Sequence, residues 1–290
     1  MIVGDGDTIV AAADPVTLTG TDVGRYAVYV NANDIAVTGV RPRWFLATVL
    51  FPVGVTEAEV VEVFEQMRAA LDEVGAVLAG GHTEVTPAVS QTVVAGQMIG
   101  TTASGRYVTT SGARPGDAVV QIGMAPVEGA AVLASTFASR LPVDIATRAA
   151  QAIDDPGISV VAAALAAAEL GATALHDPTE GGIAAGLHEL AVASGAAVRL
   201  DRDAVPWFGP GRAVCEVLGA DPWATIASGC VLAAFPGAVC DSAVARLREL
   251  GHVAAVIGSV ERGQGVLDRA GRPLAWPARD EVARLLDERA

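Results

Sequence analysis

Apolar and polar positions alternate with two different periods along the first hundred residues, and these periods predict a mixture of strands and helices. The predicted strands are Thr8–Ala13, Trp44–Phe51, Ala76–Ala79 and Ser90–Thr102. The predicted helices run from Thr21 or Asp22 to about Val37 and from Thr56 to Gly75. Either Thr21 or Asp22 can cap the first helix, which Gly39 and Pro42 should stop. Thr56 and Glu59 have the spacing of a capping box at the start of the second.

The rest of the chain shows the same mixture after residues 103–117, a segment rich in Gly, Ser and Thr. The predicted strands cover residues 118–123, 173–175, 197–201, 228–235 and 252–260. The predicted helices lie near residues 128–138, 144–153, 157–170, 183–194, 211–218, 239–249 and 278–288. Strands and helices are interleaved without a regular βαβ repeat, which favours an α+β fold with mixed sheets. We therefore expect two domains, residues 1–105 and 112–290.

The composition indicates where in the cell the protein is expected to occur. The mean hydropathy is +0.44, yet Val85–Gly105 is rich in polar residues and the apolar run Ile158–Ala168 is too short to span a bilayer. The start MIVGDGD lacks the basic region of a signal peptide, and three Cys without metal-binding spacing fit a reducing compartment. We expect a cytoplasmic protein that does not bind membranes.

Charge excludes several chemistries. The net charge is −14, which argues against a nucleic-acid partner and leaves carboxylates that can hold divalent cations. All 19 basic residues are Arg. The absence of Lys excludes a P-loop, a Schiff-base or ordinary PLP site and the phosphate-binding lysine of protein kinases.

The first candidate site is Asn31-Ala-Asn33-Asp34, inside the first predicted helix. One apolar stripe at helical spacing comprises Val23, Ala27, Val30, Asp34 and Val37. Asp34 should therefore be buried, and a buried carboxylate needs an Arg, backbone donors or a metal as partner. A salt bridge or a cap to a neighbouring loop is the plainer alternative.

The second candidate is Gly80-Gly81-His82-Thr83-Glu84, which follows a predicted strand. Two glycines let the backbone approach a ligand closely, and three polar side chains follow them. A tight turn between two strands is the alternative.

The third candidate is His176-Asp177-Pro178-Thr179-Glu180-Gly181-Gly182, between a strand and a helix. A glycine-rich turn at a helix N-terminus favours anions. The alternative is an ordinary helix start capped by Asp177 or Thr179. Asp14-Pro15, which ends the first strand, reads by itself as a turn.

Taken in order, these segments resemble the AIR synthase (PurM-like) superfamily. AVYVNANDIAVTGVRPRWFL resembles its "vNDia..Ga.P..fl" segment, and AGGHTEV resembles its "GG[DEH][ST]" loop. HDPTEGGIAAGLHELA, PVEGAAVLAS and DPWATIASGCVLAAF resemble segments of the branch that includes the hydrogenase-maturation protein HypE. The resemblance extends from Asp14 to about Val260.

The resemblance implies a homodimer in which the N-terminal domains form a β-barrel beside larger C-terminal α+β domains. It also implies ATP and Mg²⁺ as cofactors and a small-molecule substrate with an oxygen to be phosphorylated. Asp14, Asp34 and Glu84 would then hold Mg²⁺. The residues implied to contact the nucleotide or substrate are Arg25, Asn33, Asp34, Gly80, Gly81, His82, Thr83, Asp177, Thr179, Gly181 and Gly182.

Departures from the family pattern shape the functional hypotheses. The sequence lacks the family's N-terminal "DDAA"-like segment and the terminal Cys that receives the carbamoyl group in HypE. Carbamoyl dehydration on its own tail is therefore not expected, and selenophosphate synthesis is disfavoured. Gly24-Arg25 replaces a common Gly-Lys, and His82 replaces an acidic residue. The leading hypothesis is an ATP-dependent enzyme of the HypE-like group. The alternatives are a kinase like thiamine-monophosphate kinase and a non-catalytic nucleotide-binding dimer.

Overall fold

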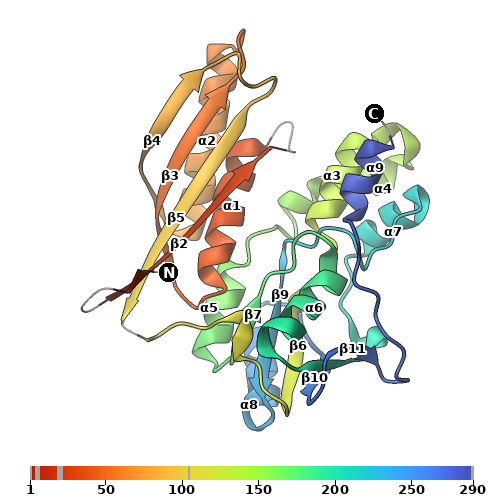
Figure 1. Cartoon of the computed structure of the whole chain (residues 1–290). Helices are drawn as coiled ribbons and strands as arrows, with labels where there is room; N and C mark the ends of the chain where they lie inside the picture. The colour runs from red at the N-terminus through yellow and green to blue at the C-terminus, as the bar shows by residue number, and fades with distance from the viewer. Residues whose placement is uncertain (1, 4–6, 18–21, 104, 289–290) are drawn as a thin grey trace. The chain divides into compact units, whose positions relative to one another are not determined.

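The structure is a computed structural model that describes residues 2–3, 7–17, 22–103 and 105–288. The chain divides into two compact units, Met1–Tyr107 and Val108–Ala290. Each unit contains one sheet with its own helices, so the predicted mixed α+β fold is confirmed (Figure 1). No helix within the described residues is long and apolar enough to cross a membrane.

The first unit is a five-stranded sheet with two helices on one face. Its strands are β1 (Ile2–Val3), β2 (Asp7–Val16), β3 (Pro42–Phe51), β4 (Val77–Val85) and β5 (Val93–Ala103), in the order β1-β2-β5-β3-β4. The neighbouring strands are antiparallel except for β3 and β4. The helices are α1 (Val23–Ala36) and α2 (Glu57–Val74), which pack side by side (Figure 1).

Alternation along β3 shows which face the helices cover. Phe45, Val49 and Phe51 are completely buried, whereas Leu46 and Leu50 between them are only partly covered. The register places Ile9 of β2 and Ile99 of β5 on the same side as Leu46 and Leu50, and Ile9 is 38% exposed. We call this side, which also carries Trp44 (37% exposed), the open face of the sheet.

The second unit is built on a six-stranded sheet in the order β11-β8-β10-β6-β9-β7. Its strands are β6 (Asp117–Gly123), β7 (Ala174–His176), β8 (Ala197–Leu200), β9 (Cys230–Pro236), β10 (Ala254–Glu261) and β11 (Gly265–Asp268). Its α-helices are α3 (Glu128–Thr136), α4 (Val143–Ala150), α5 (Val161–Glu169), α6 (Gly182–Ser194), α7 (Gly209–Leu218), α8 (Gly237–Glu249) and α9 (Glu281–Asp287).

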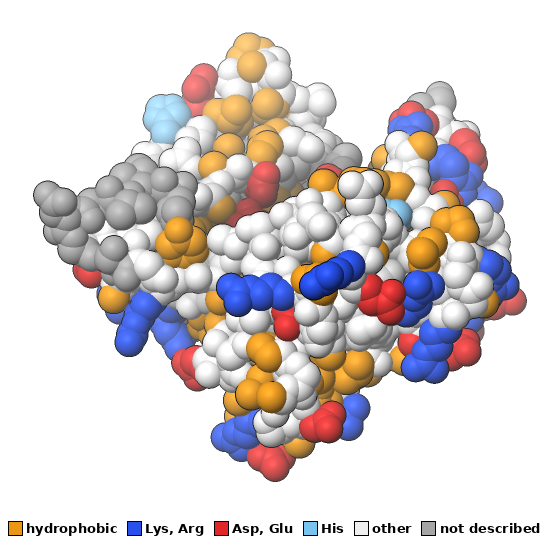
Figure 2. Space-filling model, turned by 60° about the horizontal axis from the view of Figure 1, so that its bottom comes forward, with side chains coloured by type: hydrophobic (Ala, Val, Ile, Leu, Met, Phe, Trp, Pro, Cys, Tyr) orange, Lys and Arg blue, Asp and Glu red, His pale blue; other side chains and the backbone are white. Residues whose placement is uncertain are grey.

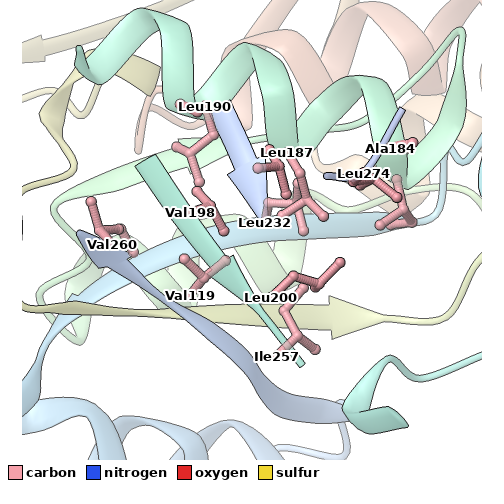
Figure 3. Packing of buried hydrophobic residues seen from close by; sticks show 14 of the residues in the cluster. Val119, Ala184, Leu187, Leu190, Val198, Leu200, Leu232, Ile257, Val260 and Leu274 are labelled. Carbon is pink, nitrogen blue, oxygen red and sulfur yellow. The ribbon is translucent and has the colours of Figure 1, made fainter. Parts of the chain in front are cut away.

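The core of this unit lies between α6 and the sheet (Figure 3). Leu187 and Leu190 of α6 are fully buried against Val119, Val198 and Leu232 from three strands. Helix α8 packs against β6, β9 and β10, and α5 packs against β9 and α8. Every residue from Cys230 to Phe235 is therefore buried, which explains why β9 is a continuous apolar run and does not alternate.

Most of the predicted elements are present, and the differences have local causes. The capping box of α2 is formed, and Gly75 ends that helix with a φ of 72°. The helix predicted from residue 157 begins only at Val161, because Gly157 (φ 87°) first forms a turn. The short strands β1 and β11 were not predicted. Asp22 occupies the N-cap position of α1, and Thr21 lies outside the described residues.

Many surface arginines lie beside carboxylates. Arg68 pairs with Glu65 and Asp72 on α2, and Arg246 pairs with Glu249 on α8. Acidic and basic side chains are interspersed over the face drawn in Figure 2. Exposed pairs of this kind contribute only about 0–1 kcal/mol each, so they affect solubility more than the stability of the fold.

Candidate functional site

Asp14 and the start of the NAND segment lie next to each other in the first unit. Asn31, which is completely buried on α1, accepts a hydrogen bond from the Asp14 backbone N–H (2.9 Å). Its amide group donates to the backbone oxygens of Asp14 (3.2 Å) and Ala27 (2.8 Å). Asn31 thereby fixes α1 to strand β2 at the position of Asp14. Asp34 lies one helical turn further along the same side of α1.

The burial predicted for Asp34 is wrong. Asp34 and Val30 are only partly buried, whereas Asn31 and Asn33 are 0% and 2% exposed. Helix α1 packs against both the sheet and α2, so its buried surface extends around most of the helix. A single apolar stripe therefore does not describe it, and the asparagines are the deeply buried polar residues.

Arg25 lies at the junction of α1 and α2. Its guanidinium is 5.9 Å from the centre of the Tyr29 ring and 4.0 Å from the Asp22 carboxylate. Tyr29 donates a 2.5 Å hydrogen bond to Glu73 of α2, and burial together with this bond raises the pKa of Tyr29 to about 12. Arg25 is therefore held by side chains of its own unit. Its contact with phosphates stays a prediction.

The GGHTE segment is not a loop or a turn but part of the edge strand β4. It pairs in parallel with β3, and all of β4 is exposed. Gly81 has a φ of 153°, and a Cβ atom there would lie 2.0 Å from the backbone oxygen of Ala47. A Cβ at Gly80 would meet nothing within 4 Å. The second glycine is thus required by the close approach of two strands.

The sheet separates Glu84 from Asp14. The register aligns Asp14, Gly96, Ala47 and Gly81 in one row across β2, β5, β3 and β4. Three strand spacings, about 14 Å, therefore separate Asp14 from Gly81. Side chains alternate along a strand, so His82 and Glu84 project from the open face, whereas Asp14 lies on the face covered by the helices. His82 Nε2 is 3.6 Å from Glu84 Oε2.

One chain therefore does not bring the three predicted metal ligands together. Among the described residues, no group of three or more His, Cys, Asp or Glu side chains has a geometry that could hold a metal. Asp14 and Asp34 lie on one side of the sheet and Glu84 on the other. Their binding of Mg²⁺ stays a prediction.

The HDPTEGG segment joins β7 to α6 by a turn whose N-cap residue is Gly181, not Asp177 or Thr179. Gly181 N–H donates to Asp280 Oδ2 (2.8 Å), and Gly182 N–H donates to the Thr179 backbone oxygen (3.0 Å). The anion at this helix start is thus a carboxylate of the chain itself. Gly181 and Gly182 are buried, whereas Asp177 and Thr179 are partly exposed.

A second buried carboxyl, which the sequence reasoning missed, lies at the start of α3. Glu128 is 7% exposed, and its Oε2 has no hydrogen-bond partner among the described residues. Burial raises its pKa to about 7, a hydrogen bond with Ser228 opposes this rise, and the nearby carboxyls of Glu180 and Asp280 add to it. The signal in the sequence was a single Glu within the apolar segment PVEGAAVLA.

All three cysteines are buried and free. Burial raises the pKa of the Cys215 thiol to about 11 and also raises the pKa values of Cys230 and Cys240. Thiolates are the reactive form of cysteine, so these side chains are poor nucleophiles and poor metal ligands in the folded chain.

The two-unit α+β fold and its polar segments match one class of protein over most of the chain. Residues 1–102 match the N-terminal domain of AIR synthase related proteins, and residues 114–268 match their C-terminal domain. The chain belongs to the AIR synthase related family, a part of the PurM-like superfamily. Within that family it belongs to the HypE-like branch.

Individual relatives support this placement. The chain is 31% identical over 253 residues to carbamoyl dehydratase HypE of Cupriavidus necator, which covers 85% of this chain and 70% of that protein. It is 30% identical over 250 residues to HypE of Azotobacter vinelandii, covering 85% and 72% of the two chains.

Solved structures show the same fold. A HypE crystallised in complex with ATP has a TM-score of 0.80 and 25% identity, covering 98% of this chain and 88% of that one. Thiamine-monophosphate kinase from Stenotrophomonas maltophilia has a TM-score of 0.76 and 21% identity, covering 92% of this chain and 86% of that one. The predicted superfamily is therefore confirmed.

Proposed function

We propose that this protein is an ATP-dependent enzyme that phosphorylates an oxygen atom of a small-molecule substrate. The observation that carries the proposal is the likeness, over nearly the whole chain, to a HypE crystallised with ATP. Phosphoryl transfer needs positioning and charge neutralisation, and it requires neither a lysine nor a covalent nucleophile. The absence of Lys and the burial of all three thiols are compatible with such chemistry.

The donor chemistry of the predicted site suits Mg²⁺, which prefers carboxylate oxygens and water as ligands. Asp14 and Asp34 would provide carboxylates from the helix-covered face, and Glu84 would provide one from the open face. Bound Mg²⁺ would supply charge neutralisation at the ATP phosphates. Asn33, Arg25 and the Gly80–Thr83 segment would contact the nucleotide, and the 177–182 turn would contact the nucleotide or substrate.

We also propose a homodimer, because one chain leaves both its open face and Glu84 without the partners that the site requires. The open face carries Ile9, Trp44, Leu46 and Ile99, an apolar set that a second copy of the sheet could cover to form a barrel. His82 and Glu84 project from the same face. Each would then face the partner subunit.

The first prediction concerns nucleotide binding. We expect Mg-ATP at 100 times its Kd to stabilise the folded chain by about 2.7 kcal/mol, visible as a raised melting temperature. We expect Asp34→Asn to remove the dependence of this shift on Mg²⁺, since the amide lacks the charge that a hard cation requires. Asp72→Asn is the control, because Asp72 is an exposed carboxylate paired with Arg68 on α2.

Absence of a thermal shift with ATP, ADP and GTP would contradict every nucleotide-binding hypothesis. An unchanged Mg²⁺ dependence in Asp34→Asn would contradict the metal role of Asp34 alone. The two alternatives are separated by products. A kinase like thiamine-monophosphate kinase leaves phosphate on the substrate, and a non-catalytic dimer binds ATP without turning it over.

A further inference from the structure

The carboxylate of Asp280 lies where the starts of two helices meet. Its Oδ2 accepts a hydrogen bond from Gly181 N–H at the start of α6, and its Oδ1 accepts one from Val282 N–H at the start of α9, both 2.8 Å long. The residue is 7% exposed. One buried side chain thus joins the HDPTEGG turn to a segment about a hundred residues further along the chain.

The turn that Asp280 holds has an unusual backbone. Gly181 and Gly182 have φ values of 77° and 63°, so two consecutive residues are left-handed. A Cβ at Gly182 would lie 2.6 Å from the backbone oxygens of both Trp223 and Thr225. Two glycines lose much conformational freedom when they adopt one conformation, so the turn needs specific bonds to stay ordered.

The segment that carries Asp280 is itself fixed to α6 and to the loop before β9. His188 Nε2 of α6 lies 2.9 Å from the Leu274 backbone oxygen, and the His188 ring stacks on Trp276 with 5.0 Å between centres. Glu281 N–H donates to the Ala224 oxygen (3.1 Å). Asp280 therefore reaches the turn from a well-anchored position.

The surroundings of Asp280 disfavour its ionised form. Burial raises the pKa of Asp280, and the neighbouring Glu180 carboxyl adds to the rise. Glu128 is also close enough for the two carboxyls to interact. A buried charge beside other acids destabilises the fold unless specific hydrogen bonds offset the cost, and the two helix-start N–H groups provide such bonds.

We propose that Asp280 is a positioning residue that holds the Gly181–Gly182 turn in the one conformation that presents Asp177 and Thr179 to the substrate. This inference rests on the proposed function, in which the 177–182 turn contacts the substrate. Asp280 acts on the reaction only through the backbone of the turn. The C-terminal segment that carries Asp280 would then support the substrate site.

The test compares Asp280→Ala, Asp280→Asn and the control Asp287→Asn, which removes an exposed carboxylate of α9 that pairs with Arg279. Amide exchange of residues 180–185 should quicken about tenfold or more in Asp280→Ala, less in Asp280→Asn and not in the control. ATP turnover with Mg²⁺ should show kcat lowered about tenfold in Asp280→Ala, with KM for ATP changed less than about twofold. Asp280→Asn keeps one acceptor oxygen and should restore part of kcat.

Unchanged exchange in a folded Asp280→Ala would overturn the proposal, and so would faster exchange with an unchanged kcat. If Asp280→Ala does not fold, Asp280→Asn carries the same comparison. If the wild-type chain neither binds nor turns over ATP, the proposed function fails. The amide-exchange rates of residues 180–185 would still show whether Asp280 holds the turn.

Discussion

Glu128 combines deep burial with an oxygen that has no hydrogen-bond partner among the described residues. A carboxyl in this position is more stable protonated, because the neutral form avoids the cost of burying a charge. The same environment places two further carboxyls, Glu180 and Asp280, close enough to interact with it. The residue therefore titrates in the folded chain far above the range of an exposed Glu.

This titration predicts a pH-dependent stability. The pKa of Glu128 is about 7 in the fold against 4.5 for an ordinary Glu, so between these values the native state holds a proton that the unfolded state has lost. The contribution of Glu128 to the free energy of unfolding should therefore be most favourable below pH 4.5. It should fall by about 3 kcal/mol in total as the pH rises to about 7. Glu128→Gln should remove this fall.

The measurement is urea unfolding of wild type, Glu128→Gln and the exposed control Glu216→Gln at several pH values between 5 and 8. Other groups also titrate between pH 5 and 8. The effect of Glu128 is therefore the difference between the variants in the slope of the free energy of unfolding against pH. Equal slopes in wild type and Glu128→Gln would show that Glu128 is ionised throughout this range.

For single residues, the sequence correctly indicated that the polar side chains of Asn31–Asp34 lie near Asp14, but it did not indicate which of them are buried. The segment Asn31–Asp34 does lie beside Asp14, but the helical period assigned burial to Asp34 and not to the asparagines. A period identifies the buried side of a helix only when one side is covered, and α1 is covered by both the sheet and α2. Asp280 gave no local signal, and the only signal of Glu128 was a single acid within an apolar segment, because the partners of both residues come from distant parts of the chain.

Among the elements, those with strong local signals could be predicted closely. The Thr56–Glu59 capping box and Gly75 bound α2 as expected, and the strand predicted at residues 228–235 is present as β9. Strand β4 was predicted too short, because Gly80-Gly81 reads as a turn when β3 is not considered. Gly81 is instead the residue that permits β4 to continue past Ala47.

A pair of glycine substitutions tests this explanation. We expect Gly81→Ala to lower the free energy of unfolding by about 1–3 kcal/mol, because the new methyl group would collide with the Ala47 oxygen. Gly80→Ala should change it by less than about 0.5 kcal/mol, since its Cβ meets nothing. Chemical denaturation of both variants gives the comparison, and equal losses would refute the steric account.

At the scale of the whole molecule, the ordered motifs in both halves were sufficient to identify the superfamily, which the family matches confirm. What the sequence could not provide is where the predicted metal ligands lie in the sheet. Asp14 and Glu84 look like members of one metal site when read as motifs, yet the register of β2, β5, β3 and β4 places them on opposite faces.

The proposed homodimer yields a prediction at this scale. We expect light scattering coupled to size exclusion to give wild type a mass of twice the chain's 29.3 kDa. Ile99→Arg should shift the protein to the monomer, because it buries a charge at the centre of the open face if the dimer forms. Val61→Arg is the control, on an exposed position of α2. A monomeric wild type would contradict the proposed assembly.

All three thiols are buried and the chain has no Lys, so thiol-reactive and amine-reactive labels would find few side chains to modify. A single cysteine placed on the exposed strand β4, for example by His82→Cys, would be the only exposed thiol among the described residues. A maleimide-linked probe would then report from one known point on the open face. Paired probes on two copies of the chain would measure how the two sheets approach each other.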